Sequence, residues 1–190
     1  MRSDRERWEA RYRDRAAREL EPPSLLLVRH QHCIPPGPVL DIAAGAGRNT
    51  LYLARAGHPV HAIDIALPAL DQISTVARAQ RLPVQFVQAD LDDFPLPRNH
   101  YAAIINIRFL QRTLIPSLKA AVRPGGVVIF EAFLIDQRTI GHPTNPDFLL
   151  QHGELAERFA DFEILSASEG RCEDEGDPVF LARLVARRWD

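Results

Sequence analysis

Two glycines one residue apart, Gly45 and Gly47, constrain the fold of this chain more than any other feature of its sequence. They stand between a short apolar run at residues 39–43 and an amphipathic run at residues 48–56. The first run predicts a strand, and the second predicts a helix that ends at Gly57. Glycine at a strand-to-helix turn accepts positive φ and lets a ligand approach the backbone without a Cβ in the way. The segment therefore predicts a βα unit with a ligand-binding loop.

The same alternation of short apolar runs and amphipathic runs continues along the chain. The expected strands cover residues 39–43, 59–65, 84–89, 101–106, 127–133, 162–168 and 179–186. The expected helices cover residues 48–56, 108–122 and 153–159, together with a helix that starts at Pro68 and carries Ala69, Leu70, Ile73, Val76 and Ala77 on one face. Strands that alternate with helices predict a parallel sheet with helices on both faces.

Local signals refine this expectation in the second half of the chain. Pro116 should kink the helix over residues 108–122, and residues 123–126 should form a turn before the next strand. A polar loop over residues 134–147 precedes the last helix. The acidic connection over residues 170–178 is short enough for a hairpin, which makes the last strand antiparallel to its neighbours.

The N-terminal segment differs from the rest of the chain, because residues 1–20 predict an amphipathic opening helix. Its apolar residues recur every four positions on one helical stripe, at Trp8, Tyr12, Ala16 and Leu20. Three prolines and a glycine at residues 35–38 predict a stiff linker. We therefore expect an N-terminal helical lid segment at residues 1–37 and one main domain at residues 38–190.

Composition limits the function classes that this chain can serve. Its 190 residues suit a single domain. The formal net charge of -2 argues against a general nucleic-acid or anionic-membrane binder, which normally carries a basic surplus. The two cysteines, Cys33 and Cys172, cannot form a disulfide framework, and no apolar run is long enough to span a bilayer. We expect a cytoplasmic protein that acts as a monomer or homodimer.

Three aspartates, Asp41, Asp64 and Asp90, stand within or at the ends of the first three expected strands. Because the carboxyl ends of parallel strands gather at one edge of a sheet, these acids and Gly45 should ring one cleft. Asp64 lies 17 residues beyond Gly47, where a carboxylate can accept hydrogen bonds from both ribose hydroxyls. Three carboxylates suit a cationic, amine-bearing nucleoside better than a polyanion.

Two phosphate-binding patterns are disfavoured at the glycine loop. A dinucleotide fingerprint needs a third glycine at position 50, and that position is Thr50. A Walker phosphate loop needs glycine, lysine and then serine or threonine, whereas Lys119 is the single lysine of the chain. The loop therefore favours a nucleoside without phosphates.

Four short motifs stand in a fixed order along the chain. They are Asp41-x-x-x-Gly45-x-Gly47, Asp64, Ala89-Asp90 and Arg123-Pro124-Gly125-Gly126. Their order and spacing resemble those of the class I S-adenosylmethionine-dependent methyltransferases. Shorter segments are similar to the small tellurite-resistance-type methyltransferases of that family. These segments are residues 8–12, 47–49, 57–58, 145–150 and 153–155.

The resemblance implies a Rossmann-like α/β fold, with a seven-stranded and mostly parallel sheet, an antiparallel last strand and helices on both faces. It implies S-adenosylmethionine as the cofactor and S-adenosylhomocysteine as the product. The cofactor-binding residues that it implies are Asp41, Ala43, Gly45, Gly47, Asn49, Asp64, Ile65, Asp90, Leu91 and Asn106. The two glycines would line the methionine moiety, Asp64 would hold the ribose, and Asp90 with Leu91 would meet the adenine.

The resemblance also implies the chemistry of the acceptor site. A sulfonium methyl group is already activated, so in-line displacement chiefly needs a nucleophile held in attack geometry. We expect a small acceptor: a thiol, a chalcogen oxyanion or a phenol. Asn106 would lie beside the transferred methyl group, and His142 is the candidate general base for a substrate that needs one. His30, His32 and Glu131 are weaker candidates for that base.

Other functions are less well supported by the sequence. The run over residues 106–109 departs from the Asp/Asn-Pro-Pro-aromatic pattern of nucleic-acid amino-methyltransferases, so we expect no nucleic-acid substrate. His30-x-His32-Cys33 lacks a fourth ligand with recognisable spacing, so we expect no metal. Two alternatives remain open. One is an S-adenosylmethionine-binding module or partner subunit without activity of its own, and the other, disfavoured by Thr50, is a nicotinamide-dependent oxidoreductase.

Overall fold

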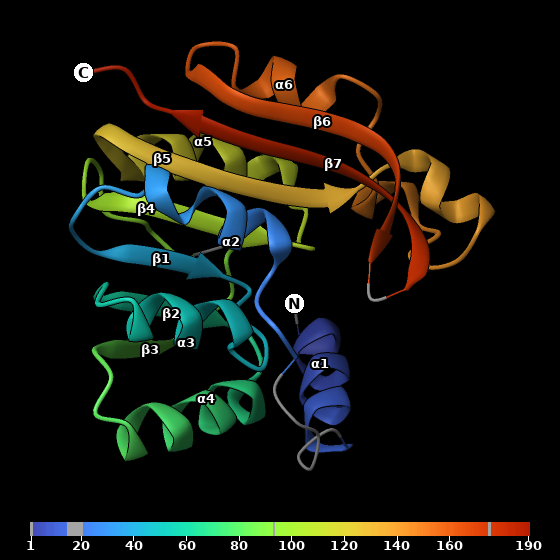
Figure 1. The fold of residues 1–190 in the computed structure, drawn as a ribbon. Coiled ribbons are helices and arrows are strands. Elements are labelled where there is room, and N and C mark those ends of the chain that lie inside the picture. Colours follow the sequence, from blue (N-terminus) through green and yellow to red (C-terminus); the bar gives the residue numbers. More distant parts are fainter. Residues whose placement is uncertain (1, 15–20, 93, 175) are drawn as a thin grey trace.

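The structure is a computed structural model and describes residues 2–14, 21–92, 94–174 and 176–190. Its strands are β1 (Val39–Ile42), β2 (Val60–Asp64), β3 (Val84–Gln88), β4 (Tyr101–Ile107), β5 (Val122–Phe133), β6 (Glu163–Asp174) and β7 (Asp177–Arg187). They form one sheet in the order β3-β2-β1-β4-β5-β7-β6 (Figure 1). β7 pairs antiparallel with β5 and β6, and the remaining pairs are parallel. The predicted seven-stranded sheet with an antiparallel last strand is confirmed.

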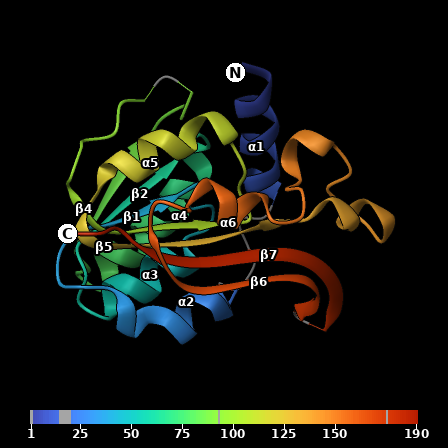
Figure 2. The ribbon, with the colours of Figure 1, turned by 90° about the horizontal axis from the view of Figure 1, so that it is seen from above.

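Helices cover both faces of this sheet (Figures 1 and 2). They are α2 (Leu25–His30), α3 (Arg48–Arg55), α4 (Leu67–Ala79), α5 (Ile115–Ala121) and α6 (Glu154–Arg158), while α1 (Arg2–Asp14) packs against α4. One apolar core joins α2 and α3 to one face, and another joins α5 and α6 to the opposite face. Because the central strands are covered on both sides, β1 and β4 are buried along their whole length, as expected for parallel strands.

The strand order places a ligand site at one edge of the sheet. The chain crosses from β3, on one side of β1, to β4 on the other side, so the carboxyl ends of β1 and β4 flank a topological switch point. Open α/β sheets bind ligands at that point. In both views α1 and the segment between β5 and α6 lie at this same edge (Figures 1 and 2).

The helix predicted over residues 108–122 is wrong in its first half. A 3-10 turn covers Arg112–Leu114, and α5 begins only at Ile115, with Pro116 in its first turn. A proline in the first helical turn lacks only an N–H that has no partner in any helix, so it starts the helix rather than kinking it. The turn predicted at residues 123–126 lies within β5, and these four residues make the shift in register between the pairs Tyr101–Val122 and Ala103–Val127.

Three other elements differ from the prediction. Residues 25–28, which lie outside every individual strand and helix expected above, belong to α2. β6 and β7 extend through most of the predicted acidic connection, as far as the pair Asp174 and Asp177, and Gly176 has φ of 89° in the tight turn between them. α1 ends at Asp14, so the predicted stripe residues Ala16 and Leu20 lie outside the described residues.

Candidate active site

The two glycines of the loop after β1 are required for different packing contacts. Gly45 has φ of 56°, and a Cβ there would lie 2.6 Å from the hydroxyl oxygen of Tyr12, which α1 brings over the loop. Gly47 has φ of 84°, and a Cβ there would lie within 3.0 Å of three carbons of Ile73 in α4. Gly45 therefore leaves space on the side that faces α1, whereas Gly47 allows the loop to pack on α4.

The loop carries one strained residue, Ala43, which has φ of 50°. A residue with a Cβ rarely adopts this left-handed conformation, and such strain is concentrated at functional sites. Ala43 was expected to contact the cofactor, and it is half-buried directly after β1. The next residues close the loop, because the Gly47 N–H donates to the carbonyl of Ala44 at 3.0 Å.

Asp64, at the end of β2, fastens the loop to the neighbouring strand. Its carboxylate accepts the N–H groups of Gly45 and Ala66, each at 2.8 Å, and the residue is 6% exposed. Burial raises the pKa of Asp64, and the backbone N–H donors oppose that shift. A carboxylate has about four acceptor positions, so Asp64 retains the capacity to bind a ligand hydroxyl.

Asp41 lies below the loop, in β1, and is 1% exposed. Its carboxylate accepts the hydroxyl of Thr50 at 2.5 Å and also the Thr50 backbone N–H, in the first turn of α3. Burial, reinforced by the charge of Asp64, raises the pKa of Asp41 to about 7. In the sequence, Thr50 counts only against a dinucleotide fingerprint, because it replaces the third glycine. In the structure, Thr50 is the hydrogen-bond donor that holds the Asp41 carboxylate in place.

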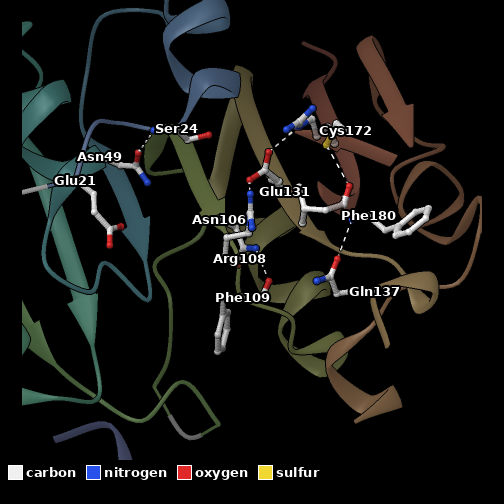
Figure 3. Close-up of polar contacts among 12 residues, drawn as sticks. Glu21, Ser24, Asn49, Asn106, Arg108, Phe109, Glu131, Gln137, Cys172 and Phe180 are labelled. Carbon is white, nitrogen blue, oxygen red and sulfur yellow. Dashed lines mark hydrogen bonds and ion pairs between the residues drawn. The ribbon is translucent and has the colours of Figure 1, made fainter. Parts of the chain in front are cut away.

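Two of the expected site residues hold the protein's own backbone. The amide oxygen of Asn49, in α3, accepts the Ser24 N–H at 2.9 Å and so ties the start of α2 to α3 (Figure 3). The amide nitrogen of Asn106, at the end of β4, donates to the Phe109 carbonyl at 2.7 Å (Figure 3). Asn106 is only 1% exposed, so it shapes the chain's exit from β4.

The remaining expected cofactor residues follow β2 and β3. Asp90 accepts the Asp92 N–H at 3.1 Å, and this hydrogen bond lowers the pKa of Asp90. Ile65 and Leu91 are half-buried. β2 and β3 are neighbours in the sheet, so these residues follow adjacent strand ends at the predicted edge.

The candidate base, His142, lies in the segment between β5 and α6. Its residue is exposed, and its carbonyl accepts the side-chain N–H of Gln137 at 3.1 Å. The Gln137 side-chain oxygen in turn accepts the Phe180 N–H at 2.8 Å (Figure 3). These contacts fix the backbone at His142, and its role as a base stays a prediction.

Arg112 clamps the same segment onto the start of α5. Its guanidinium binds both carboxylate oxygens of Glu154, at 2.7 and 2.9 Å, and donates to the carbonyls of Asp147 and Leu149, at 2.9 and 2.7 Å. Glu154 is largely buried, and the Arg112 side chain lowers the pKa of Glu154 to about 2. A second contact closes the segment, because His152 lies between Asp136 and Glu169, whose carboxylates raise the pKa of His152.

We expect Arg112→Met to lower the free energy of unfolding by about 1–2 kcal/mol, because it removes the bidentate partner of Glu154, while Arg158 still binds that carboxylate. Urea unfolding followed by circular dichroism measures the loss. Arg138→Met, at an exposed position in the same segment, is the matched control and should change stability by less than about 0.5 kcal/mol. Equal stability of the two variants would contradict the clamp.

A buried ion cluster has no signal in the sequence, although one of its members, Glu131, is a weaker candidate base there. Glu131, in β5, is 3% exposed and accepts a hydrogen bond from Nε of Arg108 at 2.7 Å (Figure 3). It accepts a second hydrogen bond from Nε of Arg183, also at 2.7 Å. Both carboxylate oxygens are therefore engaged by guanidinium groups, which does not favour a role as base. No short motif signals this cluster, since its members are 23 and 52 residues apart in the chain.

The structure adds no support for a metal site at residues 30–33. Cys33 Sγ lies 3.4 Å from His32 Nε2, and in the described part of the chain no three His, Cys, Asp or Glu residues are grouped to hold a metal ion. None of the described helices is both long and apolar enough to cross a membrane.

Comparison with known proteins agrees with this geometry. Residues 39–126 match a family model described as a methyltransferase domain. The chain is 28% identical to Hemagglutinin 1 of Eikenella corrodens over 162 residues, 78% of this chain and 53% of that protein. It is 26% identical over 169 residues to the probable S-adenosyl-L-methionine-dependent methyltransferase TehB of Haemophilus influenzae, 82% of this chain and 58% of that protein. The chain thus spans a little over half the length of these curated relatives.

Solved structures share the fold. The crystal structure of TehB from Haemophilus influenzae has a TM-score of 0.74 and 24% identity, covering 86% of this chain and 61% of that chain. The 1,6-didemethyltoxoflavin-N1-methyltransferase of Burkholderia thailandensis has a TM-score of 0.66 and 21% identity, covering 87% of this chain and 76% of that chain. By its matched domain, its fold and its relatives, the chain resembles the class I S-adenosylmethionine-dependent methyltransferases and, among them, TehB.

Proposed function

We propose that this protein transfers the methyl group of S-adenosylmethionine to a small-molecule acceptor. The observation that carries the proposal is the glycine loop after β1, which lies between two buried aspartates. The Gly45 N–H of the loop donates to Asp64, and Asp41 precedes the loop in β1 and accepts the hydroxyl of Thr50. Two carboxylates repel the phosphates of a dinucleotide, whereas they attract a cofactor with a sulfonium and an ammonium group. An uncharged ribose adds hydroxyl donors that suit Asp64.

The residues of the loop fit this cofactor. The absence of a Cβ at Gly45 lets the Tyr12 hydroxyl lie against the backbone of the loop, since a Cβ there would be only 2.6 Å from that hydroxyl. Tyr12 itself is held over the loop, because its carbonyl accepts the side-chain N–H of Gln72 in α4 at 3.1 Å. α3 begins at Arg48, directly after the glycine loop, so the positive end of its helix dipole faces the loop. This positive end would stabilise the carboxylate of the methionine moiety.

Residues that follow the next strands complete the proposed cofactor site. Ile65, Asp90 and Leu91, beyond β2 and β3, would flank the adenine, and Ala43 would contact the methionine moiety. Asn106 would face the methyl group from the end of β4. The fixed backbone around these positions supports this assignment, since Asn106 and Asp90 are both tied into turns by hydrogen bonds.

The bound cofactor supplies an activated methyl group, so the protein mainly has to orient the acceptor and exclude water. α1 and the segment between β5 and α6 flank the cofactor edge and would form the walls of the acceptor pocket (Figures 1 and 2). His142 would remove a proton where the acceptor is a phenol, whereas a thiolate needs no base. Within residues 1–37, α1 would act as the lid. α2 would stay in place, because its Leu27 is buried in the core.

A small-molecule acceptor agrees with one methyltransferase of similar fold. The toxoflavin-type methyltransferase of similar fold was solved with 1,6-didemethyltoxoflavin and S-adenosylhomocysteine bound. For this chain we propose a thiol, a chalcogen oxyanion or a phenol as the acceptor class.

Isothermal calorimetry with S-adenosylhomocysteine tests the cofactor part of the proposal. Binding at micromolar concentration is expected, and an absence of binding at millimolar concentration would sink the proposal. Turnover of labelled S-adenosylmethionine with a panel of thiols, phenols and chalcogen oxyanions tests the transfer. Binding without any turnover would favour a cofactor-binding module or partner subunit that has no activity of its own.

Asp64→Ala should weaken the binding of S-adenosylhomocysteine by more than about tenfold, because each lost charge-assisted hydrogen bond is worth roughly 1.5–3 kcal/mol. Calorimetry on a variant that retains the circular dichroism spectrum of the native protein measures this loss. Asp71→Ala removes an exposed carboxylate from α4 and should leave the affinity unchanged. Unchanged affinity in Asp64→Ala would remove Asp64 from the cofactor site.

A further inference from the structure

His152 joins the start of the segment between β5 and α6 to the sheet. It stands directly before Gly153, the residue that caps α6. Its Nε2 lies 2.6 Å from a carboxylate oxygen of Asp136, in the 3-10 helix Ile135–Thr139 at the start of the segment. Its Nδ1 lies 3.3 Å from a carboxylate oxygen of Glu169, in β6. One imidazole ring therefore connects the 3-10 helix to the edge strand of the sheet.

Both contacts of the ring exist together only when the imidazole is protonated. An ionised carboxylate is only an acceptor, so each ring nitrogen needs a hydrogen, whereas a neutral imidazole carries one. The hydrogen bonds to Asp136 and Glu169 raise the pKa of His152. Among the described residues, these two carboxylates are the charged groups that contact the ring.

Two other anchors of the segment keep their charge near neutral pH. Glu154 is bound by Arg112 and Arg158, and its pKa is about 2. Gln137 holds the 3-10 helix through uncharged hydrogen bonds to backbone groups. Deprotonation of His152 therefore breaks the link between the 3-10 helix and β6 and leaves these two anchors in place.

Building on the proposed methyl transfer, we propose that His152 is a pH-sensitive latch on one wall of the acceptor pocket. The imidazolium bridges Asp136 and Glu169 and holds the 3-10 helix to β6. When it releases a proton to solvent, one ring nitrogen presents a lone pair to a carboxylate, and that half of the bridge is lost. The link is complete below the ordinary histidine pKa of 6.5 and is lost as the pH rises through the raised pKa of His152. The wall is therefore held more firmly in acid than in alkaline solution, which regulates access of the acceptor.

Proton NMR of the histidine rings measures the ionisation of the latch in the protein without cofactor. His152 should titrate above pH 6.5, and Asp136→Asn should lower the pKa of His152, because it removes one carboxylate of the bridge. Asp147→Asn removes an exposed carboxylate from the same segment and is the matched control. This control should leave the pKa of His152 unchanged.

Hydrogen exchange measures the opening of the wall. The N–H groups of Gln137, Ile140 and Gly141 are hydrogen-bonded in and after the 3-10 helix, so their protection factors report its opening. The bridge is exposed, so these factors should fall only about three- to fivefold between about pH 5.5 and about pH 8.5. His152→Gln does not titrate and should show the lower protection at both pH values. His58→Asn, at the opposite edge of the sheet, should retain the native fall.

These measurements need neither cofactor nor turnover, so they decide the latch separately from the proposed function. Asp41 is present in every variant, so its own pH dependence cancels in the comparison. A His152 pKa at or below 6.5, an unchanged pKa in Asp136→Asn, or the same change of protection in the native protein and His152→Gln would overturn the latch. Failure of S-adenosylhomocysteine to bind would instead refute the proposed methyl transfer. Should His152→Gln not fold, Asp136→Asn removes the same bridge and is expected to show the lower protection at both pH values.

Discussion

Gly47→Ala is expected to lower the free energy of unfolding by about 2–5 kcal/mol, which is a large part of the stability of a small domain. The alanine would have to adopt φ of 84°, which costs roughly 1–2 kcal/mol. Its Cβ would also lie within 3.0 Å of Ile73 in α4, and overpacking a buried contact costs about 1–3 kcal/mol. Urea unfolding followed by circular dichroism measures the change.

Gly57→Ala separates the two causes, because Gly57 has φ of 93° but no atom within 4 Å of the position of a new Cβ. This control should lose only the conformational cost of about 1–2 kcal/mol. Adding Ile73→Ala to Gly47→Ala should reveal a favourable coupling of about 1 kcal/mol or more, since it removes the collision. Equal losses at the two glycines would show that packing against Ile73 does not explain the requirement at Gly47.

Much of the fold could be predicted from the sequence because the sheet is buried on both faces. Each central strand, such as β4, must then be a continuous apolar run, and such a run is visible without any partner. The helix α2 was missed because its six residues are too few to show a helical period. The role of Pro116 was misjudged because a proline gives the same signal whether it begins a helix or interrupts one.

The candidate site could be predicted only where its residues are close in sequence or stand at strand ends. Gly45 and Asp64 were named from the sequence, and the structure joins them by a hydrogen bond. The link from Thr50 to Asp41 was missed, because the sequence shows a threonine but not which way its hydroxyl points. The ion cluster around Glu131 depends on the pairing of β5 with β7, and that register has no signature in a single sequence.

Asp41→Asn is expected to remove most of the pH dependence that one buried carboxyl group gives to folding. The pKa of Asp41 rises from 3.8 in the unfolded chain to about 7 in the native protein, so the native state binds more protons between these values. Stability contributed by this group is therefore complete below about pH 4 and is lost as the pH rises toward 7. At 1.36 kcal/mol per pKa unit, the loss amounts to about 4 kcal/mol.

The measurement is the difference in unfolding free energy between the native protein and Asp41→Asn at several pH values between 4 and 8, without cofactor. Asparagine does not titrate, so the native protein should lose about 4 kcal/mol relative to the variant across this range. Asp71→Asn, on the exposed face of α4, controls for the loss of a carboxylate and should give a constant difference. A constant difference for Asp41→Asn as well would mean that Asp41 stays ionised in its buried position, held by Thr50.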